Sequence, residues 1–416
     1  MKSPTNIAQI ATDLLHPQGL QVSSCTSIQS LWAGYGHICH VEATWDGVAE
    51  SKLSHTQICA GDDKPQSLIL KYIQPPTTTG RGSGNANKSV EEGHIRKVLS
   101  YQVEQFFYTH LAPRMPPQIA VAPCIASINS SSGGTNTTAM VLTDLREKFP
   151  IAGEKRGTLN EIQVKAALNW LAGFHGLWWM STNDFDHSQC VLPPLEHYAQ
   201  HQSLSLPAQG GVWLNGGYTY LATRRKEYAD LQGGSDVEWS SKLCQPVGSG
   251  RSSIAELAAE LLSSSRAIGP YKTLIHGDVK SENLFTTASG DAVAFYDFQY
   301  VGLGLGVCDL AKLFTCSIPL QMLVDDLGVV YTSSKLTMQT GEEQLLRAYL
   351  SQLRKVSSKE YEWEEFVRHW ETALVDWLRF QASWGFWGNS EWLECRVRSI
   401  LNDKRWMKWL EELMVD

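Results

Sequence analysis

The chain has 416 residues, which exceeds the usual length of a single domain, so we expect one large domain with insertions or two lobes. A hydrophobic content of 43% with 10% aromatic residues is ample for a packed core and excludes a globally disordered chain. The net charge of -8 and the scattered lysines and arginines argue against a nucleic-acid-binding protein. An anionic ligand would therefore need locally arranged positive charge and metal.

The N-terminal segment "MKSPTNIAQIATDLLHPQGL" has one early lysine, no continuous apolar core and no cleavage site of small residues. This pattern is typical of a short amphipathic helix and not of a signal peptide. No stretch approaches the roughly 18 uninterrupted apolar residues that a membrane span needs. We therefore expect a soluble, cytoplasmic protein, and the nine dispersed cysteines, without a CxxC pair, favour reduced thiols.

Residues 20–75 are expected to be rich in strands. In "SIQSLWAGYGHICHVEATW", β-branched and aromatic residues flank a glycine-containing turn, as in a β-hairpin. The run "SLILKYIQ" is apolar apart from Lys71, which fits a buried strand that carries one functional cation. The low-complexity polar segment at 75–89 is expected to be a mobile loop.

The next segments complete an α+β lobe over residues 1–145. "IRKVLSYQVEQFFYTHL" has apolar residues at helical spacing. Two strand-like runs follow, "QIAVAPCIASINS" and "TAMVLTDL", joined by the polar turn "SSGGTNTT".

The remainder, residues 146–416, is expected to be mainly helical. "LNEIQVKAALNWLAGFHGLWWM" and "IAELAAELLSSS" predict two helices, and the chain beyond Asp309 is almost wholly helical in pattern. Along "YEWEEFVRHWETALVDWLRFQ", apolar residues repeat every three to four positions and form one stripe.

The stretch "LIHGDVKSENLF" at 274–285 carries the clearest chemical signal. Asp278 and Asn283 are five positions apart, which is the spacing of a phosphoryl-transfer catalytic loop, although Gly277 stands where protein kinases usually carry Arg. Two short apolar runs around the turn "ASGD" predict a hairpin that brings Asn283 and Asp297 together. Phosphoryl transfer needs a carboxylate that receives the acceptor's proton and oxygen ligands for Mg²⁺ on the ATP phosphates. Asp278 suits the first role, and Asn283 and Asp297 suit the second.

The spaced set "HGDVKSEN…YDF…GVCDLAKLF" resembles the aminoglycoside phosphotransferase and choline kinase group, small-molecule relatives of the protein kinases. Its "HGD" start, its hairpin and its later "CDLA" are most similar to the ecdysteroid-kinase-like branch. The resemblance implies a bilobal protein-kinase-like fold of the α+β class. A small β-rich N-lobe would span 1–145, and a large, mainly helical C-lobe would span 146–416, with the catalytic loop at 274–300. It also implies that Asp278 is the catalytic base and that Asn283 and Asp297 bind the metal.

The resemblance extends to the predicted N-lobe. Lys71 matches the strand lysine that contacts the α and β phosphates of the nucleotide, the alternative being an exposed edge-strand lysine. Glu104 matches the helix glutamate that pairs with this lysine, with Glu91 and Glu92 as rival choices and a solvated helix-face carboxylate as the alternative.

Two backbone segments would complete the nucleotide site. The turn "AGYGH", with Gly34 and Gly36, would cover the phosphates, although it is not a GxGxxG motif. The segment "MVLTDL" would be the hinge between the lobes, where the backbone of Thr143 or Leu145 meets the adenine.

Three further residues are expected around the catalytic loop. Lys280 matches a lysine that steadies the transferring phosphate, the alternative being a solvated loop lysine. His276 is expected to stabilise the loop and not to take protons. Asp309 is expected to hold the loop by accepting backbone hydrogen bonds.

The connection after Asp297 bears on the acceptor. Only "FQYVGLGLGVC" separates Asp297 from Asp309, and no "APE"-like motif follows, so the peptide platform of an ordinary protein kinase is missing. The glycines Gly302, Gly304 and Gly306 predict a tight loop.

The helices at 310–416 would then hold a small acceptor. More than half of the 15 tryptophans lie at or after Trp363. Trp384, Phe386 and Trp387 predict an aromatic wall for an apolar ring system or, through cation–π contacts, an amine, the alternative being ordinary helical core. A second wall could come from residues 210–228, where Arg224 and Arg225 are expected to be surface charges.

The sequence thus predicts an ATP- and Mg²⁺-dependent kinase that transfers the γ-phosphate to a hydroxyl of a small metabolite, sterol or amino-alcohol-like acceptor. The alternatives are a non-catalytic nucleotide-binding pseudokinase and an atypical protein kinase. The base, the strand lysine and the metal ligands are all present, which argues against the pseudokinase.

Overall fold

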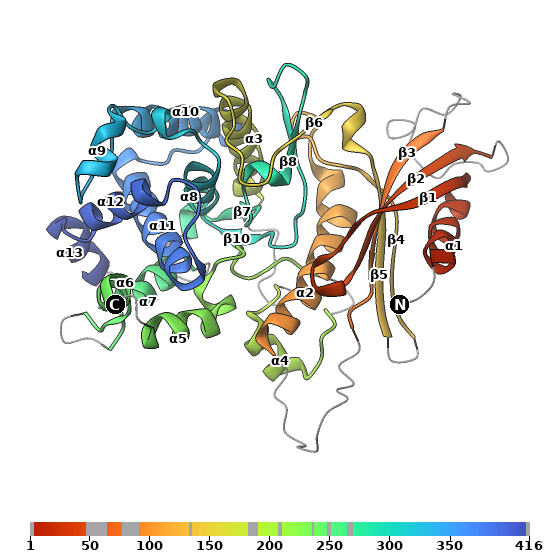
Figure 1. Cartoon of the computed structure of the whole chain (residues 1–416), viewed down its shortest axis with the longest axis horizontal. Coiled ribbons are helices and arrows are strands. Elements are labelled where there is room, and N and C mark those ends of the chain that lie inside the picture. The colour runs from red at the N-terminus through yellow and green to blue at the C-terminus, as the bar shows by residue number, and fades with distance from the viewer. Residues whose placement is uncertain are drawn as a thin grey trace.

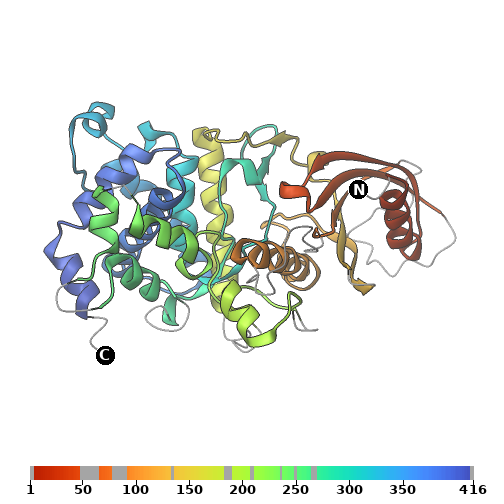
Figure 2. The same cartoon turned by 60° about the horizontal axis from the view of Figure 1, so that its bottom comes forward.

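The computed structural model describes residues 4–46, 65–76, 91–132, 135–181, 190–206, 210–234, 237–247, 251–263 and 269–412. A lobe built on a β-sheet lies at one end of the molecule and a larger helical lobe at the other (Figures 1 and 2). The predicted protein-kinase-like, α+β architecture is therefore confirmed. Residues 77–89 of the predicted mobile loop lie outside the described ranges.

Within those ranges, five antiparallel strands form the sheet of the N-lobe in the order β1-β2-β3-β5-β4. The predicted hairpin is formed by β1 and β2, and the strand that carries Lys71 is β3, at the centre of the sheet. The strands are β1 (Leu20–Ser30), β2 (Gly36–Trp45), β3 (Gln66–Ile73), β4 (Cys124–Ser132) and β5 (Thr135–Thr143).

Each face of this sheet is covered by one helix (Figure 1). Side chains alternate along β3, so that Leu68, Leu70 and Tyr72 pack in the apolar cluster shared with α1 (Pro4–Leu15). Lys71 points to the opposite face, which is covered by α2 (Glu92–Phe106). The helix continues as a π-helical turn at Phe107–Leu111, so the helix predicted over this segment is confirmed.

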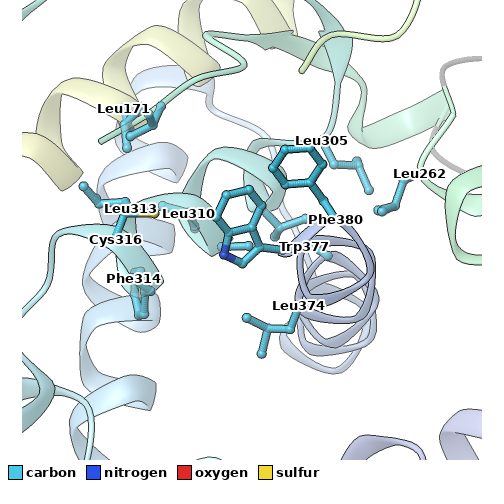
Figure 3. Packing of buried hydrophobic residues seen from close by; sticks show 14 of the residues in the cluster. Leu171, Leu262, Leu305, Leu310, Leu313, Phe314, Cys316, Leu374, Trp377 and Phe380 are labelled. Atoms are coloured by element: carbon cyan, nitrogen blue, oxygen red, sulfur yellow. The ribbon is translucent and has the colours of Figure 1, made fainter. Parts of the chain in front are cut away.

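The C-lobe is helical around α3 (Glu161–Met180), which a capping box between Asn160 and Gln163 initiates. The apolar stripe predicted on α11 (Trp363–Trp384) is buried: Trp377 and Phe380 point toward α8 (Gly306–Cys316) in Figure 3. The other helices are α4 (Pro194–His201), α5 (Arg225–Gly233), α6 (Val237–Cys244), α7 (Ile254–Leu261), α9 (Leu327–Thr332), α10 (Thr340–Ser357), α12 (Ser390–Ile400) and α13 (Lys404–Glu412). Of the helices in the described ranges, none is both long and apolar enough to cross a membrane.

Short strands hold the catalytic segment in the C-lobe. The predicted hairpin is confirmed as β8 (Leu284–Thr286) and β9 (Val293–Phe295), with β6 (Ile151–Ala152) beside it. The strand β7 (Thr273–Ile275), which leads into the catalytic loop, pairs with β10 (Gly302–Gly304).

The prediction of a tight loop at the three glycines is therefore wrong, because Gly302 and Gly304 belong to β10 and Gly306 begins α8. The physical reason is close packing of backbones. A Cβ atom on Gly302 would lie 2.4 Å from the carbonyl oxygen of Trp213 and 2.7 Å from Cα of Gly216. Glycine lets the segment around Trp213 lie directly against the strand.

We predict that Gly302→Ala lowers the free energy of unfolding by about 1–3 kcal/mol, because the added methyl group meets backbone atoms that cannot rotate away. The midpoint of urea-induced unfolding measures this change. The matched control is Gly233→Ala, at the end of α5, where nothing lies within 4 Å of the new Cβ. Equal midpoints for the two variants would contradict the packing argument.

Candidate active site

The predicted base and one predicted metal ligand lie together in the loop between β7 and β8. The Asn283 Nδ2 group donates to the Asp278 carbonyl oxygen at 2.8 Å and to Asp278 Oδ2 at 3.0 Å. The Lys280 ammonium lies 3.2 Å from the same Oδ2 atom and 2.9 Å from Glu282. Within the part of the chain that the structure describes, Asp278 Oδ1 accepts no hydrogen bond and can receive one from an acceptor hydroxyl.

The position of Gly277 is fixed by backbone packing. Its φ of 87° is left-handed, and a Cβ atom there would lie 2.3 Å from the Tyr300 carbonyl oxygen and 2.9 Å from the Gly217 nitrogen. An arginine at this position would therefore collide with two backbone segments. Glycine is required because the chain around Gly217 and Tyr300 runs directly beneath the loop.

Asp309 holds the start of this loop from α8. Its carboxylate accepts the backbone N–H groups of His276 at 2.7 Å and Gly277 at 2.9 Å. A third contact is made by His175 Nε2 at 3.2 Å. Burial opposes ionisation of Asp309, but the hydrogen bond and charge of His175 outweigh it, so the pKa of Asp309 lies below its ordinary value.

Both ring nitrogens of His276 are engaged. Nε2 lies 2.9 Å from the Tyr296 carbonyl oxygen, and Nδ1 accepts the Asp278 N–H at 3.2 Å. The ring is fully buried, and burial lowers the pKa of His276 below its ordinary value. A neutral imidazole with both nitrogens occupied fits a structural role in the loop.

Lys71 joins the two lobes. Its ammonium group lies 2.5 Å from Glu104 on α2 and 3.3 Å from Asp297, which follows β9 in the C-lobe. Neither expected rival glutamate takes the place of Glu104, because Glu91 precedes α2 and Glu92 accepts the backbone N–H of Arg225. Lys71 is buried in the central strand and is not an exposed edge lysine.

The charges in this group shift one another's pKa values. Burial raises the pKa of Glu104 to about 7, even though the Lys71 ammonium favours its ionised form. Burial would lower the pKa of Lys71, but the carboxylates of Glu104 and Asp297 outweigh it and raise the pKa. Burial likewise opposes ionisation of Asp297, and Lys71 and Lys280 overcome it, so that the pKa of Asp297 is lowered.

Asp297 has a backbone conformation that is rare for residues other than glycine. Its φ is 65°, in the left-handed region, where aspartate is among the better-tolerated residues. Such strain is frequent at functional sites. Its Oδ1 atom accepts Gln299 Nε2 at 2.6 Å and Lys71, while 31% of the side chain stays exposed.

The oxygens of Asn283 and Asp297 fit a magnesium ion. The Asn283 amide nitrogen is used by Asp278, which leaves its carbonyl oxygen as a donor to a cation. Asp297 contributes a carboxylate oxygen beyond the one held by Gln299. Magnesium prefers such hard oxygen ligands and keeps several waters, so two protein ligands suffice.

The predicted glycine turn with Gly34 and Gly36 packs against α2. Gly34 and Gly36 have φ values of 73° and 151°, and Gly36 lies so close to the Tyr72 carbonyl that no Cβ atom fits. Between them, Tyr35 is buried and contacts His94 and Tyr101. The Lys71 Nζ atom lies 5.4 Å from the ring centre of Tyr101. The rings of Tyr35 and Tyr101 therefore connect the turn to the strand lysine. Sequence reasoning missed both, although the place of Tyr35 between two glycines was a signal.

The predicted hinge residues differ in their free backbone groups. The Thr143 N–H donates to the Pro123 carbonyl at 3.0 Å and is therefore not free for adenine. The Leu145 N–H donates no hydrogen bond within the described residues. Asp144 between them is fixed by Ser67 and Arg146, which holds Leu145 in place. Leu145 is the better placed of the two.

The predicted acceptor wall is partly exposed. Trp384 and Phe386 keep 51% and 41% of their surface open, and Trp387 is half-buried. Trp387 meets Trp377 and Phe380 edge-on, with ring centres at 5.4 Å and 6.0 Å. The Asn389 N–H, two residues on, donates to the Thr315 carbonyl at 2.7 Å, and the Ser281 N–H donates to Ser317 Oγ at 2.7 Å, so the segment of Trp387 and the catalytic loop both contact the end of α8.

Sequence reasoning missed several residues on this side of the base. Lys312 and Cys316 are both buried on α8. They lie three and seven positions after Asp309 and so share its helix face, and this spacing was a signal in the sequence that they lie near the loop. Tyr218 also lies here, since its N–H donates to the Gly277 carbonyl at 2.9 Å.

The expectation for Arg224 is wrong. It is not a surface charge, because its side chain is fully buried and packs against the ring of Tyr218. Arg225, next to it, is exposed as expected.

Comparison with solved structures gives matches across nearly the whole chain at low identity. They include amicoumacin kinase hAmiN in complex with AMP-PNP, Ca²⁺ and Ami (12% identity, TM-score 0.43, 99% of this chain and 94% of that one). A choline kinase from Cryptosporidium parvum matches at 11% identity and a TM-score of 0.41, over 99% of this chain and 95% of that one. The macrolide 2'-phosphotransferase MphH from Brachybacterium faecium matches at 10% and 0.40, over 91% of both chains.

A comparison with curated proteins gives no match. The model of the ecdysteroid kinase-like family matches residues 85–360, about two thirds of the chain. This range contains Glu104, the hinge segment and the whole catalytic loop with its hairpin. The chain therefore belongs to the ecdysteroid kinase-like family, a family of small-molecule phosphotransferases.

Proposed function

We propose that the protein transfers the γ-phosphate of ATP to a hydroxyl group of a small molecule. One observation carries this proposal: side chains from β3, α2, the catalytic loop and the end of β9 form two groups whose segments are joined by the Tyr296 N–H, which donates to the Asn283 carbonyl at 3.0 Å. Lys71 links Glu104 to Asp297, and Asn283 holds the carboxylate of Asp278. Positioning and charge neutralisation are what phosphoryl transfer chiefly requires.

Lys71 binds the nucleotide phosphates in this mechanism. Its amine is kept protonated by two carboxylates and is held in place by Glu104. Asn283 and Asp297 would hold Mg²⁺, which supplies neutralising charge at the phosphates when bound. The Leu145 N–H, which has no acceptor among the described residues, would donate to adenine.

Asp278 orients the acceptor hydroxyl and takes its proton at Oδ1, since Oδ2 is held by Asn283 and Lys280. Lys280 lies beside this carboxylate. Burial opposes its charge, but Asp278 and Glu282 raise the pKa of Lys280, so it remains an ammonium group that can steady the transferring phosphate.

A small acceptor is favoured over a protein substrate by the segment after Asp297. It is taken up at once by β10, which pairs with β7, and by α8, which is buried along most of its length. No residues remain there for a peptide platform.

We predict that Asp278→Ala lowers turnover by about 10²–10⁴-fold while ATP binding is largely retained, because only the proton acceptor is removed. Release of ADP across a panel of hydroxyl metabolites measures turnover, and calorimetry measures nucleotide binding. Asp291→Ala, at the exposed turn of the same hairpin, is the control and should keep full activity. Equal turnover of Asp278→Ala and the parent would overturn the assignment.

For Asp297→Ala we expect loss of the magnesium-dependent part of ATP binding, because one of the two oxygen ligands is gone. Calorimetric titration of ATP with Mg²⁺ and with a chelator separates this part from the remainder. A variant whose affinity still rises with Mg²⁺ as in the parent would remove Asp297 from the metal site.

Glu104 predicts a pH dependence of nucleotide affinity. Its pKa is raised to about 7, so below that pH it is protonated and no longer holds the Lys71 ammonium. We expect Mg-ATP affinity to fall as the pH decreases through about 7, and Glu104→Gln to bind more weakly with a flatter profile. Isothermal titrations from about pH 6 to 8 compare the two. Parallel profiles would show that another group sets the dependence.

A further inference from the structure

Arg224 lies in a cage of aromatic rings. Its guanidinium carbon is 3.8 Å from the ring centre of Tyr218 and 5.3 Å from those of Phe380 and Trp384. Phe380 and Trp384 are stacked at 6.1 Å, and Phe380 meets Tyr218 edge-on at 5.8 Å. Three rings around one positive charge are the arrangement that recognises quaternary amines in ligand sites. Here the cation at the centre belongs to the protein.

The polar contacts of Arg224 hold it in the cage. Nε donates to the Tyr218 carbonyl at 2.8 Å, and Nη1 donates to Glu227 at 2.9 Å. Nη2 is buried without a hydrogen-bond partner within the described residues. The side chain is fully buried, so its position is fixed by packing as well as by charge.

Glu227 is already used by two guanidinium groups. Arg96 lies 3.6 Å from the oxygen that accepts Arg224, and Arg96 also donates to the Thr223 carbonyl at 2.6 Å. Burial opposes ionisation of Glu227, but Arg224 and Arg96 outweigh it and lower its pKa. The negative charge of Glu227 is therefore balanced by two guanidinium groups and attracts an added amine only weakly.

The cage adjoins the predicted base. Tyr218 donates its N–H to Gly277, the residue before Asp278, and its ring meets that of Tyr300 edge-on at 4.9 Å. Burial raises the pKa of Tyr300 to about 12, and Arg224 and Asp278 both act on this phenol. The Tyr300 carbonyl also accepts the Gly217 N–H at 3.1 Å, so Tyr300 packs against both the cage residue Tyr218 and the segment that precedes it.

The other charges near this side are also cationic or paired. Lys312 on α8 is buried, and its ammonium lies 3.6 Å from where a Cβ of Gly217 would be. Asp376 on α11 is bound by Arg379 at 2.7 Å. The cations Arg224 and Lys312 therefore lie on this side, and the carboxylate oxygens that the described residues leave open here are Asp278 Oδ1, which takes the acceptor hydroxyl, and Asp376 Oδ2.

We propose that Arg224 fills the aromatic cage with the protein's own cation and thereby restricts the acceptor to hydroxyl compounds without a positive charge. This inference rests on the proposed function, because it concerns the acceptor of that reaction. Of the two acceptors that the aromatic wall alone would allow, an apolar ring system and an amine, the filled cage excludes the amine. Arg224 acts as a specificity-determining residue through repulsion and occupancy.

The test uses two probes of the same shape, choline and its uncharged analogue 3,3-dimethyl-1-butanol, bound in the presence of Mg-ADP. In Arg224→Met the rings are vacated and Glu227 keeps only the more distant Arg96. We therefore expect choline to bind at least tenfold more tightly to this variant than to the parent, with little gain for the alcohol. Quenching of tryptophan fluorescence or calorimetry gives both dissociation constants.

Arg224→Lys keeps a positive charge in the cage and should reject choline as the parent does. Arg225→Met changes the exposed neighbouring arginine and is the matched control. If Arg224→Met does not fold, Arg224→Gln, which can still donate to the Tyr218 carbonyl, carries the same comparison. A choline affinity in the neutral variants no better than in the parent overturns the inference.

The two proposals fail separately. A parent that does not bind Mg-ATP contradicts the proposed function. A parent that binds Mg-ATP, but binds choline as tightly as the alcohol, contradicts only the role of Arg224.

Discussion

The buried ammonium of Lys71 is the charge on which the geometry of the site depends. It is held at 2.5 Å by Glu104 and at 3.3 Å by Asp297, and these three residues come from β3, α2 and the end of β9. A buried charge without a partner is costly, and removal of one partner from such a pair destabilises by about 3–5 kcal/mol. The ion pairs of Lys71 therefore fix the positions of the sheet, of α2 and of the end of β9 in the C-lobe relative to one another. Because Asp297 also offers an oxygen to a cation, the contact that joins the lobes also builds the nucleotide site.

A second constraint is the approach of backbones beneath the catalytic loop. Gly277 and Gly302 each leave no room for a side chain, and the segment 213–217 fills the space against both. The Gly277 carbonyl then accepts the N–H of Tyr218, which belongs to the aromatic cage. The glycine in "HGD" and Gly302 thus have one cause. They allow the acceptor-side segment to lie directly under the base, where a protein kinase would need an arginine and a longer connection.

The features that the sequence predicted are those with local causes. The alternation along β3 indicated a buried strand with one cation, and the spacing from Asp278 to Asp297 indicated a loop followed by a hairpin. Arg224 could not be predicted in this way. Its burial depends on the rings of Phe380 and Trp384, which are more than 150 residues away in the chain and meet Arg224 only in the fold. For Gly302 the sequence showed a turn-forming residue, whereas pairing with β7 makes it a strand residue and the contact with Trp213 requires a glycine there.

The net charge of -8 says little about the site, because the local charge there depends on how each buried cation is paired with carboxylates. Glu104 pairs with Lys71, whereas Glu227 is shared between Arg224 and Arg96, so that one positive charge of these two guanidinium groups is left over on the acceptor side. What distinguishes the two sides of the site is where the polar atoms remain open. On the nucleotide side these are carboxylate and amide oxygens, which suit a metal ion. On the acceptor side they include Asp278 Oδ1, which receives the hydroxyl, together with Nη2 of Arg224 and the ammonium of Lys312, which forms no ion pair within the described residues. Cationic acceptors are therefore rejected on that side because the Arg224 guanidinium and the Lys312 ammonium are not fully balanced by carboxylates. The net charge of the whole chain does not decide this selectivity.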